Sequence, residues 1–152
     1  MENWDQTFIN IANIISKHST CIRVNVGVVI VRDGRILSTG YNGSPSKFQH
    51  CKDVFANVSD LTNLEFIQQH RQFSDKYEIH SEINAILYAA KNGIGLYGSK
   101  MYVTHSPCTN CSKIIISSGI IEVVYDCLYD RDPDGVLLLK DGGILVRKFN
   151  EI

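Results

Sequence analysis

The sequence predicts one α/β domain, a sandwich of helices around a central mixed sheet, over residues 1–152. Segments with apolar residues at helical spacing alternate with short β-branched apolar runs, which is the pattern of such a fold. The first two runs flank an Asp-Gly pair, which indicates a β-hairpin. A hairpin pairs its strands antiparallel, so we expect a sheet that is not purely parallel.

The individual elements follow from the same patterns in chain order. Trp4, Phe8 and Ile11 recur at helical spacing and predict an opening amphipathic helix. The other expected elements are strands at 26–31, 35–41, 101–104, 121–125 and 144–149, and helices at 57–71, 81–91, 108–118 and 133–140. Residues 45–55 are expected to be irregular, and Cys127, at the end of an apolar strand, is expected to lie in the core.

Composition and charge exclude some functions. The 15 Lys and Arg residues nearly balance the 16 Asp and Glu residues, so no overall basic field attracts a polynucleotide, and we expect no nucleic-acid partner. An apolar run of the roughly 18 residues that span a bilayer is absent, so no membrane association is expected. The N-terminus is polar and unlike a signal peptide, which predicts a cytoplasmic protein (host cytoplasm if viral) with five reduced cysteines.

Two short motifs predict a metal centre: His80-Ser81-Glu82 and Pro107-Cys108-Thr109-Asn110-Cys111. Cys108 and Cys111 are three residues apart at the start of an expected helix, so both sulfurs can face one ion, and the helix dipole favours their thiolate form. His80 supplies a third ligand from the start of another helix. Three protein ligands leave one position of Zn2+ open, which is typical of catalytic zinc, and we expect a strand before each motif helix.

Glu82 is expected to be the catalytic residue and not a fourth ligand. A carboxylate beside the metal can take a proton from a water of lowered pKa and then donate it, as general base and general acid. The competing interpretation is a structural zinc site with an incidental glutamate. The combination of His-x-Glu with Pro-Cys-x-x-Cys favours catalysis, because it is the known signature of zinc deaminases.

Beyond these ligands the chain resembles the deoxycytidylate (dCMP) deaminases of the cytidine deaminase superfamily, in particular the phage-type enzymes. The resemblance covers residues 21–129 and rests on three blocks: 40–45 (GYNGSP), 78–87 (EIHSEINAIL) and 102–108 (YVTHSPC). It implies a three-layer α-β-α cytidine-deaminase-like fold with a central five-stranded mixed sheet. The sequence departs from the family at Ser81, where alanine is more common.

The resemblance also implies an activity and its regulation. Hydroxide at the zinc would attack C4 of cytosine, and dCMP would become dUMP and ammonia in pyrimidine deoxynucleotide metabolism. Many members are homohexamers that dCTP activates together with Mg2+ and that dTTP inhibits. Such regulation and assembly are therefore expectations for this chain.

A second zinc is implied by four further residues. Phage-type members carry a structural zinc on two cysteines, a histidine and a glutamate, and Cys21, Cys51, His70 and Glu78 stand at matching positions. Four filled positions would make that zinc structural. His50, adjacent to Cys51, is a rival ligand, and two ordinary buried cysteines are the simpler alternative.

Nucleotide contacts are expected at two places. The resemblance makes Asn42, Gly43 and Ser44 part of a loop that contacts substrate or effector, although Asn-Gly and Ser-Pro are also ordinary turn dipeptides. Tyr88 and Lys91 stand where phage-type enzymes carry an aromatic and a basic residue that influence nucleotide choice and subunit contacts; the alternatives are a core aromatic and a solvated lysine. For the 5′-phosphate the candidates are Lys47, Lys91 and Arg131.

Other functions remain open at this point. The same chemistry serves deaminases of dCTP, free cytosine, guanine or tRNA adenosine, of which near-neutral charge disfavours the last. A zinc-stabilised binding module without catalysis is the alternative from another class. The intact Glu82 argues against it, because a structural zinc site needs no proton shuttle.

Overall fold

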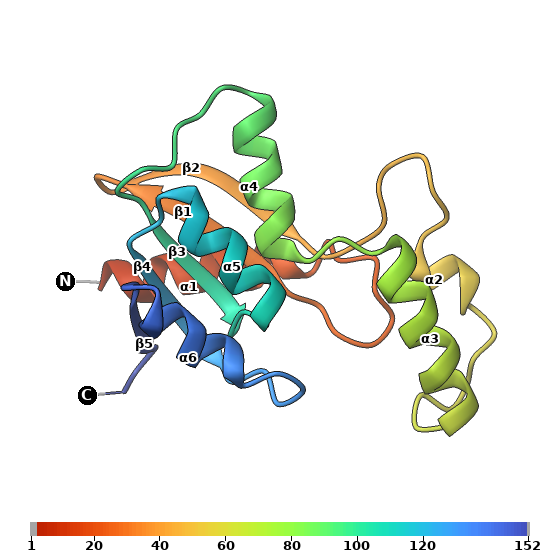
Figure 1. Ribbon diagram of the computed structural model, residues 1–152. Coiled ribbons are helices and arrows are strands. Elements are labelled where there is room, and N and C mark those ends of the chain that lie inside the picture. Colours follow the sequence, from red (N-terminus) through yellow and green to blue (C-terminus); the bar gives the residue numbers. More distant parts are fainter. Residues whose placement is uncertain (1–2, 152) are drawn as a thin grey trace.

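The computed structural model describes residues 3–151 and contains one five-stranded sheet in the order β2-β1-β3-β4-β5 (Figure 1). The strands are β1 (Gly27–Arg32), β2 (Arg35–Tyr41), β3 (Lys100–His105), β4 (Glu122–Cys127) and β5 (Leu145–Lys148). β2, β1 and β3 pair antiparallel, whereas β3, β4 and β5 pair parallel. The expected mixed sheet is therefore confirmed. Asp33 and Gly34 take the positive φ angles of a tight hairpin turn between β1 and β2.

Helices cover both faces of the sheet and make three layers (Figure 1). They are α1 (Trp4–Ser16), α2 (Cys51–Val54), α3 (Leu64–Tyr77), α4 (Ser81–Lys91), α5 (Thr109–Ser118) and α6 (Asp134–Asp141). Alternate residues of β1 point to opposite faces of the sheet. Val29 and Val31 pack with α1, and Val28 and Ile30 pack in the larger core that α4, α5 and α6 cover.

α2 and α3 form a lobe beside the sandwich, seen at the right of Figure 1. Phe55 and Phe66 make a small core of their own there, together with Cys21 and Cys51. The stretch of chain from β2 to α4, together with Cys21 from before β1, thus builds a smaller cluster outside the two cores of the sandwich. None of the helices within residues 3–151 is long and apolar enough to cross a bilayer.

Several expected elements differ in the structure. Residues 45–55, expected to be irregular, contain the short helix α2, and the helix expected at 57–71 begins only at Leu64, after its N-cap Asn63. A strand does not precede α4: a single bridge between Gly43 and Ile79 stands in its place. That expectation was wrong, because α3 occupies the preceding residues.

The prediction that Cys127 lies in the core is also wrong. Cys127 is exposed, although it ends an apolar strand. β5 pairs with β4 only as far as Tyr125, so the last residues of β4 extend past the cover that β5 gives.

Candidate active site

The first cluster of metal ligands lies where two helices begin. His80 is the N-cap of α4, Cys108 is the N-cap of α5, and Cys111 lies in the first turn of α5. Nδ1 of His80 is 3.6 Å from Sγ of Cys108 and 3.4 Å from Sγ of Cys111. Tetrahedral zinc with ordinary Zn–S and Zn–N bonds requires an N···S separation of about 3.6 Å. These three side chains therefore fit a zinc ion and fill three of its positions.

The two thiols of this cluster are electrostatically coupled. The Cys111 thiol and, to a lesser degree, His80 hydrogen-bond to Cys108 and lower its pKa to about 4. The neighbouring Cys108 sulfur and burial raise the pKa of Cys111. Two thiolates this close repel one another unless a cation lies between them, and a divalent metal ion would allow both to ionise.

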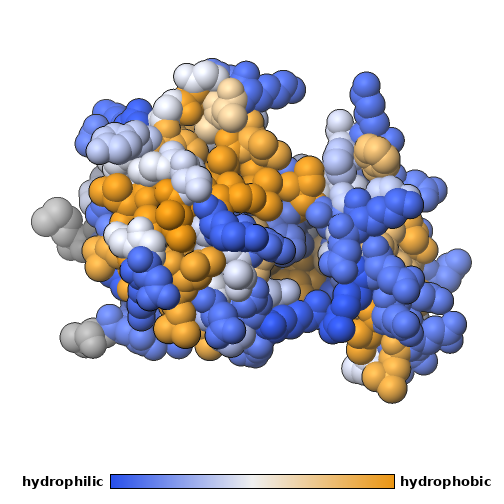
Figure 2. All heavy atoms as spheres, in the orientation of Figure 1, coloured by the Kyte–Doolittle hydropathy of each residue, from blue (hydrophilic) through white to orange (hydrophobic). Residues whose placement is uncertain are grey.

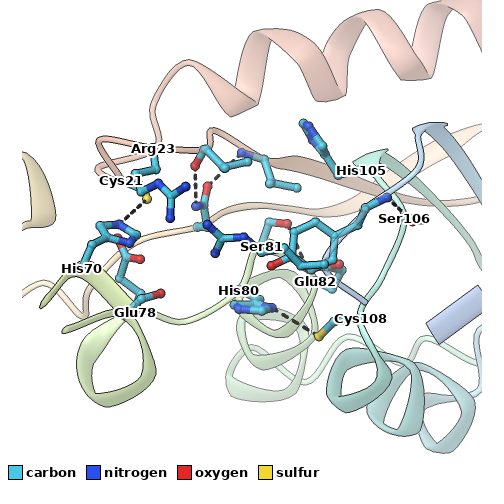
Figure 3. Close-up of a pocket in the computed structure, with 16 residues that line it drawn as sticks. Cys21, Arg23, His70, Glu78, His80, Ser81, Glu82, His105, Ser106 and Cys108 are labelled. Atoms are coloured by element: carbon cyan, nitrogen blue, oxygen red, sulfur yellow. Dashed lines mark hydrogen bonds between the residues drawn. The ribbon is translucent and has the colours of Figure 1, made fainter. Parts of the chain in front are cut away.

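Glu82 lies beside this cluster and is not one of its three ligands. Its carboxyl group is almost fully buried, which raises its pKa. Ser81, the residue that departs from the family pattern, donates a hydrogen bond of 3.0 Å from Oγ to Oε2 of Glu82. The serine thus fixes the carboxyl group at the pocket wall (Figure 3).

The second cluster unites Cys21, Cys51, His70 and Glu78, whose ligand atoms all lie within 4.8 Å of one another. Sγ of Cys21 is 3.3 Å from Nε2 of His70. Oε1 of Glu78 is buried and has no hydrogen-bond partner within the described residues, as expected of an oxygen that binds a cation. These four donors fit a closed tetrahedral zinc site.

His50, the rival ligand, does not join the second cluster. It is the N-cap of α2 and lines a different hollow. The chain direction explains this, because adjacent residues at a helix start point in different directions. Cys51 alone reaches the cluster from this segment.

Both clusters open into one pocket (Figure 3). Cys21, His70 and Glu78 lie on one side of it, and His80, Glu82 and Cys108 lie on the other. His105 at the end of β3 and Ser106 just after it also line the pocket, which therefore lies at the carboxyl end of a parallel strand, where ligands bind in open α/β sheets.

The expected nucleotide contacts separate into two places. Asn42 lines the pocket of the two clusters, but its amide is already engaged: Oδ1 accepts from the Val26 N–H at 2.9 Å and Nδ2 donates to the Val24 carbonyl at 2.8 Å. Asn42 therefore holds the chain that leads into β1. Gly43 and Ser44 turn away from this pocket.

A second hollow receives those two residues, together with Tyr88 and Lys91. Tyr88 is 55% exposed, so it is not the core aromatic that was the alternative. Gly43 approaches Thr20 so closely that a Cβ atom would lie 2.4 Å from Oγ1 of that residue. Of the phosphate candidates, Lys91 lines this second hollow, Arg131 lines the pocket of the clusters, and Lys47 lines neither.

Two pocket residues, His105 and Arg23, were not among the site residues expected from the sequence, although His105 lies within the block 102–108. His105, at the end of β3, is half-buried, and burial lowers its pKa, so the imidazole is neutral at pH 7. Arg23 lies between Cys21 and β1. Its proximity to Cys21 was the one available signal, because a ligand of the second cluster brings its neighbours to the pocket.

Comparisons with known proteins agree with this geometry. Residues 2–127 match the family model of the cytidine and deoxycytidylate deaminase zinc-binding region. A deoxycytidylate deaminase of Enterobacteria phage T4 is 39% identical over 92% of this chain and 86% of its own length. A deoxycytidylate deaminase of Saccharomyces cerevisiae is 35% identical over 97% of this chain and 45% of its own length.

A solved structure is similar over the whole fold. The dCMP deaminase of cyanophage S-TIM5, crystallised in complex with dCMP and dUMP, superposes with a TM-score of 0.79 at 31% identity, covering 98% of this chain and 99% of that one. The fold and the metal-ligand residues of this chain therefore agree with membership of one family. The chain belongs to the cytidine and deoxycytidylate deaminase family of zinc-binding proteins.

Proposed function

We propose that this chain deaminates dCMP hydrolytically to dUMP and ammonia. One observation carries the proposal: a buried carboxyl group, Glu82, lies unligated beside a three-ligand metal cluster inside an open pocket. The names of the T4 and S-TIM5 relatives support dCMP as the substrate. Deamination of dCTP, free cytosine or tRNA adenosine, or a binding role without catalysis, is the alternative.

In the mechanism, His80, Cys108 and Cys111 would hold the zinc ion. Zinc bound there would lower the pKa of water to about 7 and so supply a nucleophile at neutral pH. Glu82 accepts the protons that the attacking water gives up and passes one to N3 of the ring and one to the departing amino group. The C4–N bond breaks, C4 becomes a carbonyl, and ammonia leaves.

Two features of the site suit Glu82 to this role: the hydrogen bond from Ser81 and the burial of the carboxyl group. The hydrogen bond from Ser81 orients the carboxyl group, and burial raises the pKa of Glu82, which favours uptake of the proton that Glu82 donates later in the reaction.

We further propose that Cys21, Cys51, His70 and Glu78 bind a structural zinc. The buried, unpartnered Glu78 oxygen supports this assignment, and a full set of four protein ligands leaves no position for water. The ion would join α2, α3 and the segment before β1, which come from distant parts of the chain. Its binding would contribute folding energy to the α2–α3 lobe.

The direct test is Glu82→Gln assayed by ammonia release from dCMP. We expect turnover to fall at least 10²- to 10⁴-fold, the usual contribution of a positioned general acid or base, with two zinc ions retained per chain. Glu65→Gln, on the exposed face of α3, is the matched control and should keep full activity. An active Glu82→Gln variant would refute the assigned role.

The substrate is tested with a panel of dCMP, CMP, dCTP, cytosine, guanine and tRNA. We expect dCMP to give the highest kcat/KM. Ammonia release from another member of the panel at a higher kcat/KM would replace dCMP as substrate. No release from any of them would leave the binding module as the better interpretation.

We also propose that the second hollow binds a nucleotide effector, dCTP with Mg2+ or dTTP, in a homohexamer. Its volume of about 580 Å3 and the presence of Lys91 and the exposed Tyr88 support a nucleotide there. Figure 2 shows hydrophobic side chains on the face that carries α4 and α5, and Leu87 and Ile114 are exposed members of those helices. Such a face is typical of an interface between subunits.

The effector proposal is tested by titrating dCTP into the wild type and Lys91→Ala while the mass is followed by analytical ultracentrifugation. We expect a hexamer in the wild type and weaker dCTP binding in the variant. A monomeric wild type whose activity does not change with dCTP or dTTP would contradict both the effector site and the hexamer.

The five free cysteines support a reducing, cytoplasmic location, in a host cell if the source is viral.

A further inference from the structure

Residues 128–133, here called the pocket loop, connect β4 to α6 and form part of the wall of the pocket that both metal clusters share. The chain leaves the sheet at the end of β4 and loops outwards before it enters α6 (Figure 1). Tyr129 of this loop lines the pocket, whereas most of its neighbours in the loop are exposed. A loop with so little packing of its own opens easily unless hydrogen bonds hold it to the rest of the fold.

The first attachment of the pocket loop lies two residues before Cys108. The backbone N–H of Tyr129 donates to Oγ of Ser106 at 2.7 Å, and the Ser106 N–H donates to the carbonyl of Cys127 at 2.8 Å. Ser106 is itself buried and lines the same pocket (Figure 3). The beginning of the loop is therefore fixed to the segment that leads to Cys108.

The second attachment lies one residue after Cys108. Thr109 is the first residue of α5, and its backbone N–H and its hydroxyl group both donate to the carboxylate of Asp132, at 2.7 and 2.8 Å. The shorter distance is typical of an N–H donor and a charged acceptor. The backbone N–H and then the hydroxyl group of Thr109 favour the ionised carboxylate and lower the pKa of Asp132. The end of the loop is therefore fixed to α5.

Asp132 gives α5 a cap that the helix does not provide for itself. The first N–H groups of a helix have no partner within the helix, and the side chain of the N-cap residue usually accepts from one of them. The N-cap of α5 is Cys108, a ligand of the catalytic metal cluster, whose sulfur accepts only from the Cys111 N–H at 3.5 Å. The carboxylate of Asp132 accepts from the Thr109 N–H instead and places negative charge at the positive end of the helix dipole.

We propose that Asp132 is a positioning residue, which holds the pocket loop on the start of α5 and so fixes the pocket wall at Tyr129 relative to Cys108. This inference rests on the proposed deamination, because it names a residue that shapes the pocket for that reaction. The two attachments lie on either side of Cys108, so the metal ligand and the wall share one support. Asp132 itself lies outside the metal cluster and the pocket lining, and it acts through Thr109 and Tyr129.

Loss of the second attachment should weaken substrate binding more than turnover. A loop that is closed in only a fraction of the molecules reduces the apparent affinity by that fraction, whereas bound substrate itself favours the closed loop. The loss of a capping side chain shifts such an equilibrium by about 2- to 30-fold. We therefore expect Asp132→Ala to raise KM for dCMP by about 2- to 30-fold and to lower kcat by less than about twofold.

The kinetic test compares Asp132→Ala, Asp132→Asn and Thr109→Val with the wild type. Asp132→Asn keeps one acceptor oxygen and Thr109→Val removes only the hydroxyl donor, so each should raise KM less than Asp132→Ala does. Thr109→Val added to Asp132→Ala should change KM no further, because the acceptor is already absent. Asp130→Asn is the matched control, since it removes an exposed carboxylate of the same loop and should leave KM unchanged.

The proposal is overturned if Asp132→Ala has the KM of Asp130→Asn, or if its kcat falls while its KM stays that of the wild type. Circular dichroism and urea unfolding establish that each variant is folded. If Asp132→Ala does not fold, the milder variants Asp132→Asn and Thr109→Val decide in its place, by the same rise in KM at nearly constant kcat.

Hydrogen–deuterium exchange, read by mass spectrometry, tests the pocket loop without any turnover. Peptides that cover residues 128–133 should exchange faster in Asp132→Ala than in the wild type and Asp130→Asn, while peptides of β1 should exchange equally in all three. Faster exchange of the loop supports the role of Asp132 even if dCMP is not deaminated, in which case only the proposed reaction fails. Equal exchange of the loop in all three proteins refutes the role of Asp132 while the reaction stands.

Discussion

Gly135 offers a sharp test of how the fold positions the catalytic cluster. It lies in the first turn of α6, pressed against the segment that carries Cys108. A Cβ atom added to Gly135 would lie 2.0 Å from the carbonyl oxygen of Pro107 and 2.7 Å from the carbonyl carbon of Cys108. Ser112 of α5 fixes the same contact by donating to the Gly135 carbonyl at 2.9 Å.

We therefore predict a specific defect in Gly135→Ala. An ordinary C···O contact is about 3.3 Å, so α6 or the Pro107–Cys108 backbone must retreat by about 1.3 Å from the present 2.0 Å. Overpacking of this kind costs about 1–3 kcal/mol in the free energy of unfolding. A displaced Cys108 should also weaken zinc binding at the catalytic cluster by about 10- to 100-fold, as does the loss of other outer contacts of metal ligands.

The assay is zinc competition against a chelator of known affinity, combined with urea unfolding. Gly95→Ala is the control, because a Cβ there meets nothing within 4 Å and neither glycine has a positive φ. The control should bind zinc as the wild type does and change stability by less than about 1 kcal/mol. If Gly135→Ala behaves like Gly95→Ala in both measurements, the packing of α6 does not hold the ligand in place.

Three further predictions concern stability and metal content. Glu122→Gln should cost about 1–3 kcal/mol in urea unfolding at pH 7, because its buried carboxylate contacts Lys100 at 2.9 Å and Arg147 at 2.6 Å. Burial opposes ionisation, but Lys100 and Arg147 outweigh it and lower the pKa of Glu122. The stability that the ionised carboxylate contributes is therefore complete above its unfolded pKa of about 4.3 and is lost as the pH falls through its folded pKa. A stability difference between the variant and the wild type that persists at pH 2 would contradict the assignment. Cys21→Ser should reduce the zinc content by atomic absorption from about two ions to one per chain and make the α2–α3 lobe sensitive to proteolysis; two ions retained would exclude the second site. Asn42→Ala should lower stability by about 1–3 kcal/mol, since it strands the Val26 N–H and the Val24 carbonyl, whereas a raised KM for dCMP at unchanged stability would show that the amide contacts nucleotide instead.

The sequence predicted the sheet and the first cluster because both depend on local spacing. Alternation in β1 assigns Val28 and Val29 to opposite faces, and the three-residue separation of Cys108 and Cys111 at a helix start brings their sulfurs to one ion. Such relations are fixed by backbone geometry within a few residues. They can therefore be predicted without knowledge of the tertiary structure.

The second cluster and the nucleotide contacts depend on the paths of loops, which local spacing does not determine. Cys21 and His70 are 49 residues apart, and only the family resemblance suggested that they meet. Adjacent residues Asn42 and Gly43 look like one contact loop in the sequence, but they line different hollows because the Gly43–Ile79 bridge fixes the chain between them. Arg23 has no motif at all, and only the structure shows that it lines the pocket with a buried, unpartnered nitrogen.

The short segment from Glu78 to His80 links the two metal clusters mechanically. Glu78 and His80 both have extended backbone angles, and alternate residues of an extended chain lie on the same side, so one ligand of each cluster faces the shared pocket. Ile79 between them pairs with Gly43 through two backbone hydrogen bonds of 3.1 and 2.9 Å, which prevents the segment from rotating. A metal ion that fixes Glu78 therefore also fixes the backbone that carries His80. Loss of the structural metal site should consequently lower the catalytic activity, because it frees one end of the segment that positions His80, a ligand of the catalytic site.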